Sequence, residues 1–130
     1  LGNVYSKRDW GYAKDYVELM WKMLQKKVPE DFVIATGKSN SIKSFINECL
    51  NYLNIKAKWK GKGLNLRLIR ASDKKTIIKI NPKYFRPADV NVLKGDAKKA
   101  SKILGWKPKT DFKKLVKIMM EEEIKYYKKI

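Results

Sequence analysis

The apolar residues of this chain change their spacing after Asn54, and that change limits the folds it can adopt. Up to Asn54 they recur every three or four residues, in two stretches that each predict an amphipathic helix. The first helix stops before Pro29, and its apolar positions are Ala13, Tyr16, Val17, Met20, Trp21 and Leu24. The second is capped by Ser41 and turns inward Ile42, Phe45, Ile46, Cys49, Leu50 and Leu53. After Asn54 apolar and polar residues alternate in 64–70 and 76–80, which predicts a β-hairpin.

The remaining elements are short. Residues 31–37, DFVIATG, predict a buried strand that ends at Gly37, and the two prolines in NPKYFRPADV predict an irregular segment there. Asp96 is expected to cap a helix over 97–104 that Gly105 closes. Thr110 is expected to cap the last helix, with Phe112, Leu115, Val116, Met119 and Ile124 inward. The predicted fold class is therefore α/β, mostly helical, with a few short strands and a hairpin.

Composition excludes several classes of protein. The chain has 130 residues and 44% hydrophobic content, enough for one folded domain despite a formal charge of +18. One Cys and no His argue against a metal site, a disulfide framework and a histidine base, and Cys49 is expected to be a buried thiol. No stretch resembles a signal peptide or is long and apolar enough to span a bilayer, so a cytoplasmic location and no membrane partner are expected.

The basic charge has two interpretations. The segment KAKWKGK, residues 56–62, interleaves a Trp among lysines, which is typical of a nucleic-acid-binding module. However, 27 of the 31 basic residues are Lys and they are spread along nearly the whole chain, whereas base readout and bidentate phosphate contacts favour Arg. A Lys-rich solvated surface is the favoured interpretation, nucleic acid is not the expected partner, and a nucleic-acid-binding module remains the alternative function.

Two motif matches are interpreted as chance. Tyr52 and Lys56 fit the Tyr-x-x-x-Lys pattern of short-chain dehydrogenases, but they straddle the predicted end of a helix, so their side chains would not share a helical face. GKG at 61–63 lacks the third glycine and the strand and helix of a dinucleotide-binding loop, so it is interpreted as a turn.

Two arginines stand beside carboxylates in positions that suit a nucleotide. Arg8 and Asp9 come shortly before a predicted helix N-terminus, where amide donors favour an anion. Arg86 lies in the Pro-containing loop YFRPAD, three residues before Asp89. Two guanidinium groups suit a pyrophosphate, and a carboxylate can accept hydrogen bonds from ribose hydroxyls. The alternative is that both Arg–Asp combinations are structural ion pairs that anchor loops.

Three stretches, in this order and spacing, resemble one known family: LGNVYSKRDWGYAKDYVELMW, DFVIATG and NPKYFRPADVNVLKGDAKKASKILGWKPKTDF. They are similar to the C-terminal part of GDP-mannose 4,6-dehydratase, a family of extended short-chain dehydrogenase/reductases. The similarity covers essentially the whole chain. It implies that residues 1–130 are a single substrate-binding domain of a lyase that converts GDP-mannose to GDP-4-keto-6-deoxymannose. It also implies that a Rossmann domain, which binds NADP and carries the catalytic residues, is not present in this chain.

The same resemblance implies roles for six residues. Arg8 and Arg86 match arginines that meet the pyrophosphate, Asp89 matches the acidic residue on the ribose, and Leu1, Gly2 and Asn3 match a loop near the base. The family usually has Glu where this chain has Asp89, which reaches one methylene less far. No catalytic residue is expected in this chain, and alone it is expected to be inactive and to bind no cofactor. The expected partners are GDP-mannose or a related GDP-sugar, the absent Rossmann domain and, in the complete enzyme, further copies of itself. A non-catalytic remnant is a third interpretation.

Overall fold

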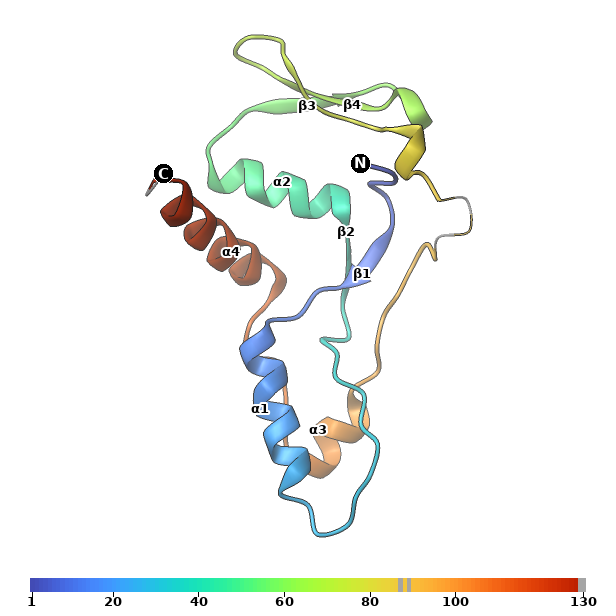
Figure 1. Ribbon diagram of the computed structural model, residues 1–130, viewed down its shortest axis with the longest axis vertical. Helices are drawn as coiled ribbons and strands as arrows, with labels where there is room; N and C mark the ends of the chain where they lie inside the picture. The colour runs from blue at the N-terminus through green and yellow to red at the C-terminus, as the bar shows by residue number, and fades with distance from the viewer. Residues whose placement is uncertain (87, 89, 129–130) are drawn as a thin grey trace. The chain divides into compact units, whose positions relative to one another are not determined.

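The computed structural model of the chain describes residues 1–86, 88 and 90–128, and the chain divides into two compact units (Figure 1). We call the first, Leu1–Ser6 with Ser41–Asn91, the sheet unit. We call the second, Lys7–Asn40 with Val92–Ile130, the helical unit. Each is described by itself.

The sheet unit consists of one helix and a three-stranded antiparallel sheet. Helix α2 (Ile42–Tyr52) begins where predicted, because the Ser41 side chain accepts a hydrogen bond from the Ser44 amide at 3.0 Å. The strands β3 (Ala57–Lys60), β4 (Arg67–Arg70) and β5 (Thr76–Lys79) lie in the order β3-β4-β5. The predicted hairpin is confirmed as β4–β5. Strand β3, which pairs with β4 from Ala57↔Arg70 to Lys60↔Arg67, was not predicted, although its sequence AKWK alternates apolar and basic residues.

One face of this sheet forms the core of the unit. Val4, Leu66 and Ile80 are buried together, and Ile46 of α2 and Trp59 of β3 pack against them. In Figure 1 α2 runs along the same side of the sheet. The inward face of α2 is confirmed in outline, but its apolar side chains are only half-buried, and Leu53 remains 41% exposed. The segment after β5 is irregular as predicted, with a single 3₁₀ turn at Pro82–Tyr84.

The helical unit contains α1 (Ala13–Leu24), α3 (Lys98–Leu104) and α4 (Phe112–Tyr127). It also contains β1 (Lys7–Asp9), which pairs with β2 (Ser39–Ser41), a strand whose last residue is counted with the sheet unit. The core of the helical unit joins Leu19 of α1, Ala100 of α3 and Trp106. Helix α1 spans the predicted residues, but much of its predicted apolar stripe faces outward. Four members of that stripe are at least half exposed: Val17, Met20, Trp21 and Leu24.

The predicted strand over 31–37 is wrong. Phe32 and Ile34 pack against the helical core, as alternate residues of a strand would, and Ala35 is buried. No described residue, however, exchanges a backbone hydrogen bond with residues 32–35. A strand is defined by its ladder, so an apolar segment without a neighbouring strand cannot become one. Gly37 does take the left-handed conformation, with φ of 73°.

The helix ends correct two details of the prediction. Asp111, rather than Thr110, caps α4: its carboxylate accepts a hydrogen bond from the Lys114 amide at 2.8 Å, while Thr110 is buried one residue earlier. Helix α3 begins at Lys98, and Asp96 accepts from the amide of Lys98 at 3.0 Å. Gly105 closes α3 with a left-handed φ of 61°, as predicted. Among the described residues, no helix is long and apolar enough to cross a membrane.

Candidate functional site

The backbone of Gly2 lies directly against the turn that precedes Arg86. A Cβ at Gly2 would stand 1.9 Å from the carbonyl oxygen of Tyr84, so only glycine fits this position. The carbonyl of Leu1 accepts a hydrogen bond from the Asn81 amide at 2.7 Å, just before the same turn. The fold therefore brings residues 1–2 and 81–86, far apart in sequence, to one place in the sheet unit.

A small cavity opens beside this contact. Its volume is about 140 Å³, and it is lined by Gly2, Asn3, Val4, Tyr5, Gly63, Leu64, Leu66, Ile80 and Phe85. The lining is largely apolar, with two aromatic side chains, Tyr5 and Phe85, that are each about half exposed. The Asn3 side chain accepts a hydrogen bond from the Tyr5 amide at 2.9 Å, which fixes the loop around the cavity. Two of the predicted site residues, Gly2 and Asn3, thus line this cavity.

Arg86 follows Phe85 directly and its side chain is exposed. The predicted ribose residue Asp89 lies outside the described residues, as does Pro87. The structure therefore places four of the six predicted site residues, Leu1, Gly2, Asn3 and Arg86, in one region of the sheet unit.

Arg8 belongs to the helical unit, where it lies in β1 and donates to the carbonyl of Lys7 at 2.8 Å. Its neighbour Asp9 has a structural role. The Asp9 carboxylate accepts from the amides of Thr36, Gly37 and Gly95 at 2.8, 2.9 and 3.3 Å, and from the Thr36 hydroxyl. These bonds tie the end of DFVIATG to the loop before α3. The Asp of RDWG therefore organises the backbone beside Arg8.

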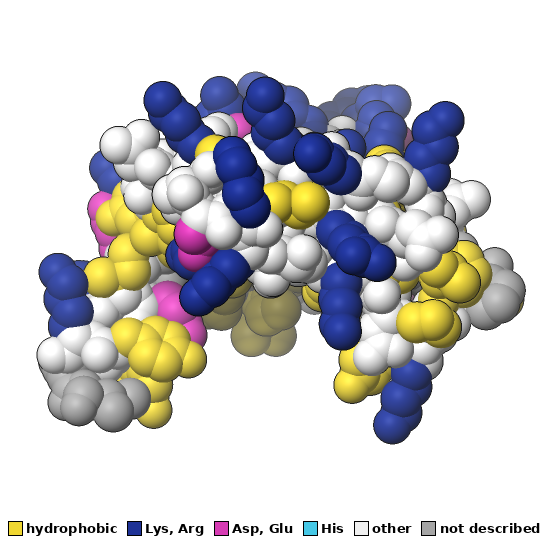
Figure 2. Space-filling view, turned by 90° about the horizontal axis from the view of Figure 1, so that it is seen from above, with side chains coloured by type: hydrophobic (Ala, Val, Ile, Leu, Met, Phe, Trp, Pro, Cys, Tyr) yellow, Lys and Arg dark blue, Asp and Glu magenta, His cyan; other side chains and the backbone are white. Residues whose placement is uncertain are grey.

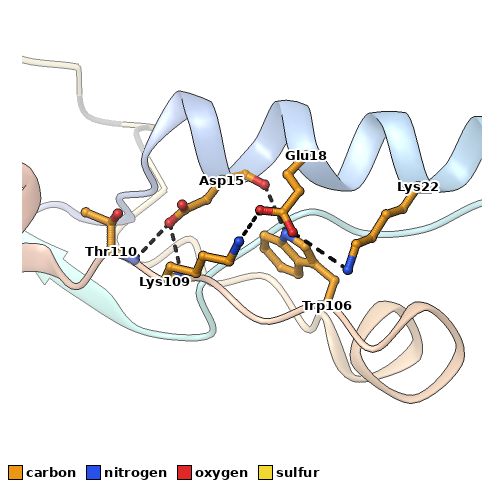
Figure 3. Close-up of polar contacts among 6 residues, drawn as sticks. All are labelled: Asp15, Glu18, Lys22, Trp106, Lys109 and Thr110. Carbon is orange, nitrogen blue, oxygen red and sulfur yellow. Dashed lines mark hydrogen bonds and ion pairs between the residues drawn. The ribbon is translucent and has the colours of Figure 1, made fainter.

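A second carboxylate with a similar role was not predicted. Asp15, on α1, is buried, and its carboxylate accepts from the amides of Lys109 and Thr110 at 3.0 and 2.8 Å (Figure 3). Its backbone carbonyl accepts from the indole of Trp106 at 2.9 Å. The close-up shows all of these contacts meeting on one side of α1. The sequence signal for this role is a charged residue at a position of α1 that faces the helical core.

Nearby charges and burial shift the pKa values of three side chains around α1. The Lys109 ammonium donates to Glu18, which holds the pKa of the Glu18 carboxyl below its ordinary value of 4.5 and raises the pKa of Lys109. The pKa of the Tyr16 phenol is raised, first by burial and then by the charges of Asp9 and Asp15. Tyr16 packs against the helical core, with its ring edge-on to that of Trp106.

The dismissed motifs behave as chance matches. Tyr52 is the last residue of α2 and Lys56 lies beyond the helix, so the two do not share a helical face. Gly61 and Gly63 both have positive φ and belong to a turn after β3. Within the described residues, no group of His, Cys, Asp and Glu could hold a metal ion.

Comparisons with known proteins agree on one family. The family model described as GDP-mannose 4,6 dehydratase matches residues 1–119. GDP-mannose 4,6 dehydratase of Drosophila melanogaster is 46% identical over 99% of this chain and 33% of its own length. The Homo sapiens protein of that name is 43% identical over 95% of the chain and 33% of its own length. The chain thus spans about a third of these curated relatives.

Solved structures share the fold at lower identity. A UDP-glucose 4-epimerase from Thermotoga maritima, solved with UDP-glucose, has a TM-score of 0.71 at 23% identity, over 98% of this chain and 34% of that one. RMD from Pseudomonas aeruginosa, solved with NADPH, has a TM-score of 0.68 at 14% identity, over 93% and 34%. These likenesses show a shared fold, and with the four helices and short strands of this chain they confirm the predicted α/β fold class.

Proposed function

Because the chain belongs to the GDP-mannose 4,6 dehydratase family, we propose that it is the GDP-sugar-binding part of an enzyme converting GDP-mannose to GDP-4-keto-6-deoxymannose. In that proposal residues 1–130 are the substrate-binding region. A separate nucleotide-binding domain supplies the reaction centre of this lyase.

The single observation that supports this function best is the cavity beside Gly2. Its lining contains two of the residues that the family resemblance assigns to the base, Gly2 and Asn3, and it ends at Phe85, next to Arg86. Its volume of about 140 Å³ is below the roughly 300–1,000 Å³ typical of complete ligand sites. It therefore suits one ring system, with the rest of the ligand outside. Tyr5 and Phe85 offer aromatic surface to a flat base.

In this assignment Arg86 contacts the pyrophosphate. Its planar guanidinium can donate two parallel hydrogen bonds to phosphate oxygens, and its position on a Pro-flanked loop limits the conformational entropy lost on binding. Arg8 is proposed as a second pyrophosphate contact, held on β1 beside the Asp9 network. Asp89 is proposed to accept hydrogen bonds from the ribose.

The chain's part in catalysis is to hold and orient the nucleotide, so that binding energy remote from the hexose is used to position the sugar. NADP is the proposed cofactor of the complete enzyme, in keeping with a neighbour solved with NADPH. This sequence contains no Gly-rich nucleotide loop, and so its own residues do not fit that cofactor. We assign cofactor binding and the hydride and proton transfers to the other domain.

The same domain is the proposed partner of two features of the helical unit. Residues 32–35 have backbone groups that no described residue pairs, and α1 carries the exposed apolar stripe that includes Trp21 and Leu24. The edge of a neighbouring sheet would supply hydrogen-bond partners for the backbone of residues 32–35. A domain packed against α1 would cover its exposed apolar stripe. Assembly of the complete enzyme into a homo-oligomer is also proposed.

The test is calorimetric titration of GDP-mannose into the protein that carries this chain together with its nucleotide-binding domain. Arg86→Lys keeps the positive charge but loses the bidentate geometry, so affinity is expected to fall by about 1–2 kcal/mol, or roughly 5- to 30-fold. Lys83→Gln, which removes an exposed cation from the same loop, is the matched control and should leave affinity unchanged. Equal affinities for wild type and Arg86→Lys would contradict the assignment. Binding without turnover in the complete protein would favour a non-catalytic remnant.

A further inference from the structure

The outer face of the β3-β4-β5 sheet carries a row of cations that the strand register brings together. Lys60, Arg67 and Lys79 are paired across the three strands. Lys58 lies two residues before Lys60 and so on the same face. All four side chains are exposed, and Figure 2 looks onto this face with Lys and Arg side chains standing over it. We call Lys58, Lys60, Arg67 and Lys79 the basic sheet face.

This face has almost no carboxylates to balance it. Residues 56–79 contain nine basic side chains and a single acidic one, Asp73, and Asp73 is already paired with Arg70 through two hydrogen bonds. No ion pair between described residues involves a member of the basic sheet face. In the helical unit, by contrast, the carboxylates Glu18, Glu30 and Glu121 each pair with lysine. The charge imbalance is therefore local.

Other side chains on this sheet limit what could bind there. Trp59, the aromatic residue of KAKWKGK, points to the opposite face, where it packs in the core and donates to Asn47 at 3.0 Å. The described strand residues therefore offer no exposed aromatic ring on which single-stranded bases could stack. Nor do they offer an aromatic anchor for a membrane interface, since the most exposed apolar residue of the strands is Ile77, at 38%.

We propose that the basic sheet face binds the sugar-phosphate backbone of a double-stranded nucleic acid, without reading its sequence. A duplex carries one negative charge for about every 1.7 Å of its axis. Neighbouring strands are about 4.8 Å apart and alternate residues along a strand about 6.6 Å. Each cation therefore has a phosphate within reach in any register. Lys serves phosphate as a point charge, which suits contacts that need no fixed angle. From the charge total alone, the sequence favoured a solvated Lys-rich surface. The strand register and the scarcity of carboxylates on this sheet instead favour a binding face.

The experiment measures fluorescence anisotropy of a short, labelled duplex of random sequence titrated with the protein at about 50 mM and about 200 mM salt. Four phosphate contacts predict a slope of log affinity against log salt of about −3.6, so that binding weakens roughly 100-fold between the two conditions. The variant Lys58→Gln, Lys60→Gln, Arg67→Gln and Lys79→Gln should lose most of that slope.

The matched control replaces four exposed lysines of the helical unit, Lys14, Lys27, Lys102 and Lys113, by Gln. It removes the same net charge and should leave both slope and affinity near those of the wild type. Equal losses in the two variants would show that only total charge matters and would overturn the proposal. The proposal would also be overturned if no duplex binding were found at the lower salt concentration, or if phosphatidylserine vesicles of equal charge concentration were bound more tightly than the duplex. GDP-mannose affinity, measured in parallel, should be unchanged in both variants, so this proposal can fail independently of the proposed function.

Discussion

The indole nitrogen of Trp106 donates to the backbone carbonyl of Asp15 at 2.9 Å, while the side chain of the same Asp15 accepts two further hydrogen bonds from the chain just after Trp106. One residue of α1 thus fixes the segment LGWKPKT by both its main chain and its carboxylate. The result is an anchor for the start of α4, whose cap is Asp111.

Asp15→Ala should destabilise the helical unit strongly. The change leaves the amides of Lys109 and Thr110 without their acceptor at a position that is 7% exposed, and a buried donor without a partner costs about 1–3 kcal/mol. A total loss of about 2–4 kcal/mol is expected from urea unfolding. Asp15→Asn, which keeps one acceptor oxygen, should lose about half as much. Equal stability of Asp15→Ala and wild type would show that the contact is not formed in solution.

Gly2→Ala should weaken GDP-mannose binding indirectly, by displacing the neighbouring turn. A methyl group at Gly2 would overlap the carbonyl of Tyr84, so the turn that carries Phe85 and Arg86 must shift. An order-of-magnitude loss of affinity is expected, because small misplacements of positioning groups are costly. Ser72→Ala, in the turn between β4 and β5 of the same unit, is the control, since Ser72 is exposed and is not part of the cavity lining. Calorimetric titration of both variants checks this, and a wild-type affinity in Gly2→Ala would contradict the proposed site.

Acid should destabilise the protein partly through three carboxyl groups. Arg70 lowers the pKa of Asp73 from 3.8 to about 2. Lys109 lowers that of Glu18, and Lys26 that of Glu30, below 4.5. Since the folded pKa values are depressed, the stabilisation is complete above the unfolded values and is lost as pH falls through the folded ones. For Asp73 that window runs from 3.8 down to about 2.

Urea midpoints measured at about pH 6 and about pH 3 provide the check. Glu18→Gln should lose less stability between the two conditions than the wild type does, because it has no carboxylate left to protonate. Glu123→Gln is the control, since no described residue forms an ion pair with Glu123. The idea fails if Glu18→Gln and the wild type lose equal stability.

Tyr52→Phe should leave turnover of the complete enzyme within a few-fold of wild type. Tyr52 ends α2 and Lys56 lies beyond it, and so the pair lacks the shared helical face that a proton relay would need. Loss of a true general acid or base costs about 100-fold or more. A fall of that size in steady-state assays, with an unchanged circular dichroism spectrum, would mean that Tyr52 is catalytic.

Local patterns predicted most of the fold, and they were wrong where a distant partner decides the structure. Ser41, Gly37 and Gly105 act within one turn of their own position, so sequence alone identifies them. The pairing of β3 depends on partners in β4 that lie 7 to 13 positions away, and no local pattern names those partners. The segment 32–35 shows the reverse error, because its composition predicts a strand while no described residue supplies the ladder.

The candidate site divides in the same way. The resemblance pointed to Gly2 and Arg86, but the steric reason for Gly2 appears only once Tyr84 lies against it. The sequence suggested Asp9 as an ion-pair partner of Arg8 and gave no role to Asp15, and in the structure both carboxylates accept hydrogen bonds from backbone amides. A carboxylate that bonds to main-chain groups has no partner that a sequence pattern could reveal.

The backbone of residues 32–35, which no described residue pairs, also has a practical consequence. An apolar segment whose amides and carbonyls lack partners is a template on which another chain can add a strand. Val33, 52% exposed, presents an open side chain on this edge. Copies of this chain produced alone will therefore tend to aggregate through this edge, increasingly as concentration rises. Because this aggregation would arise from strand pairing at residues 32–35 and not from a poorly packed core, replacing Val33 by a charged residue should keep the chain in solution.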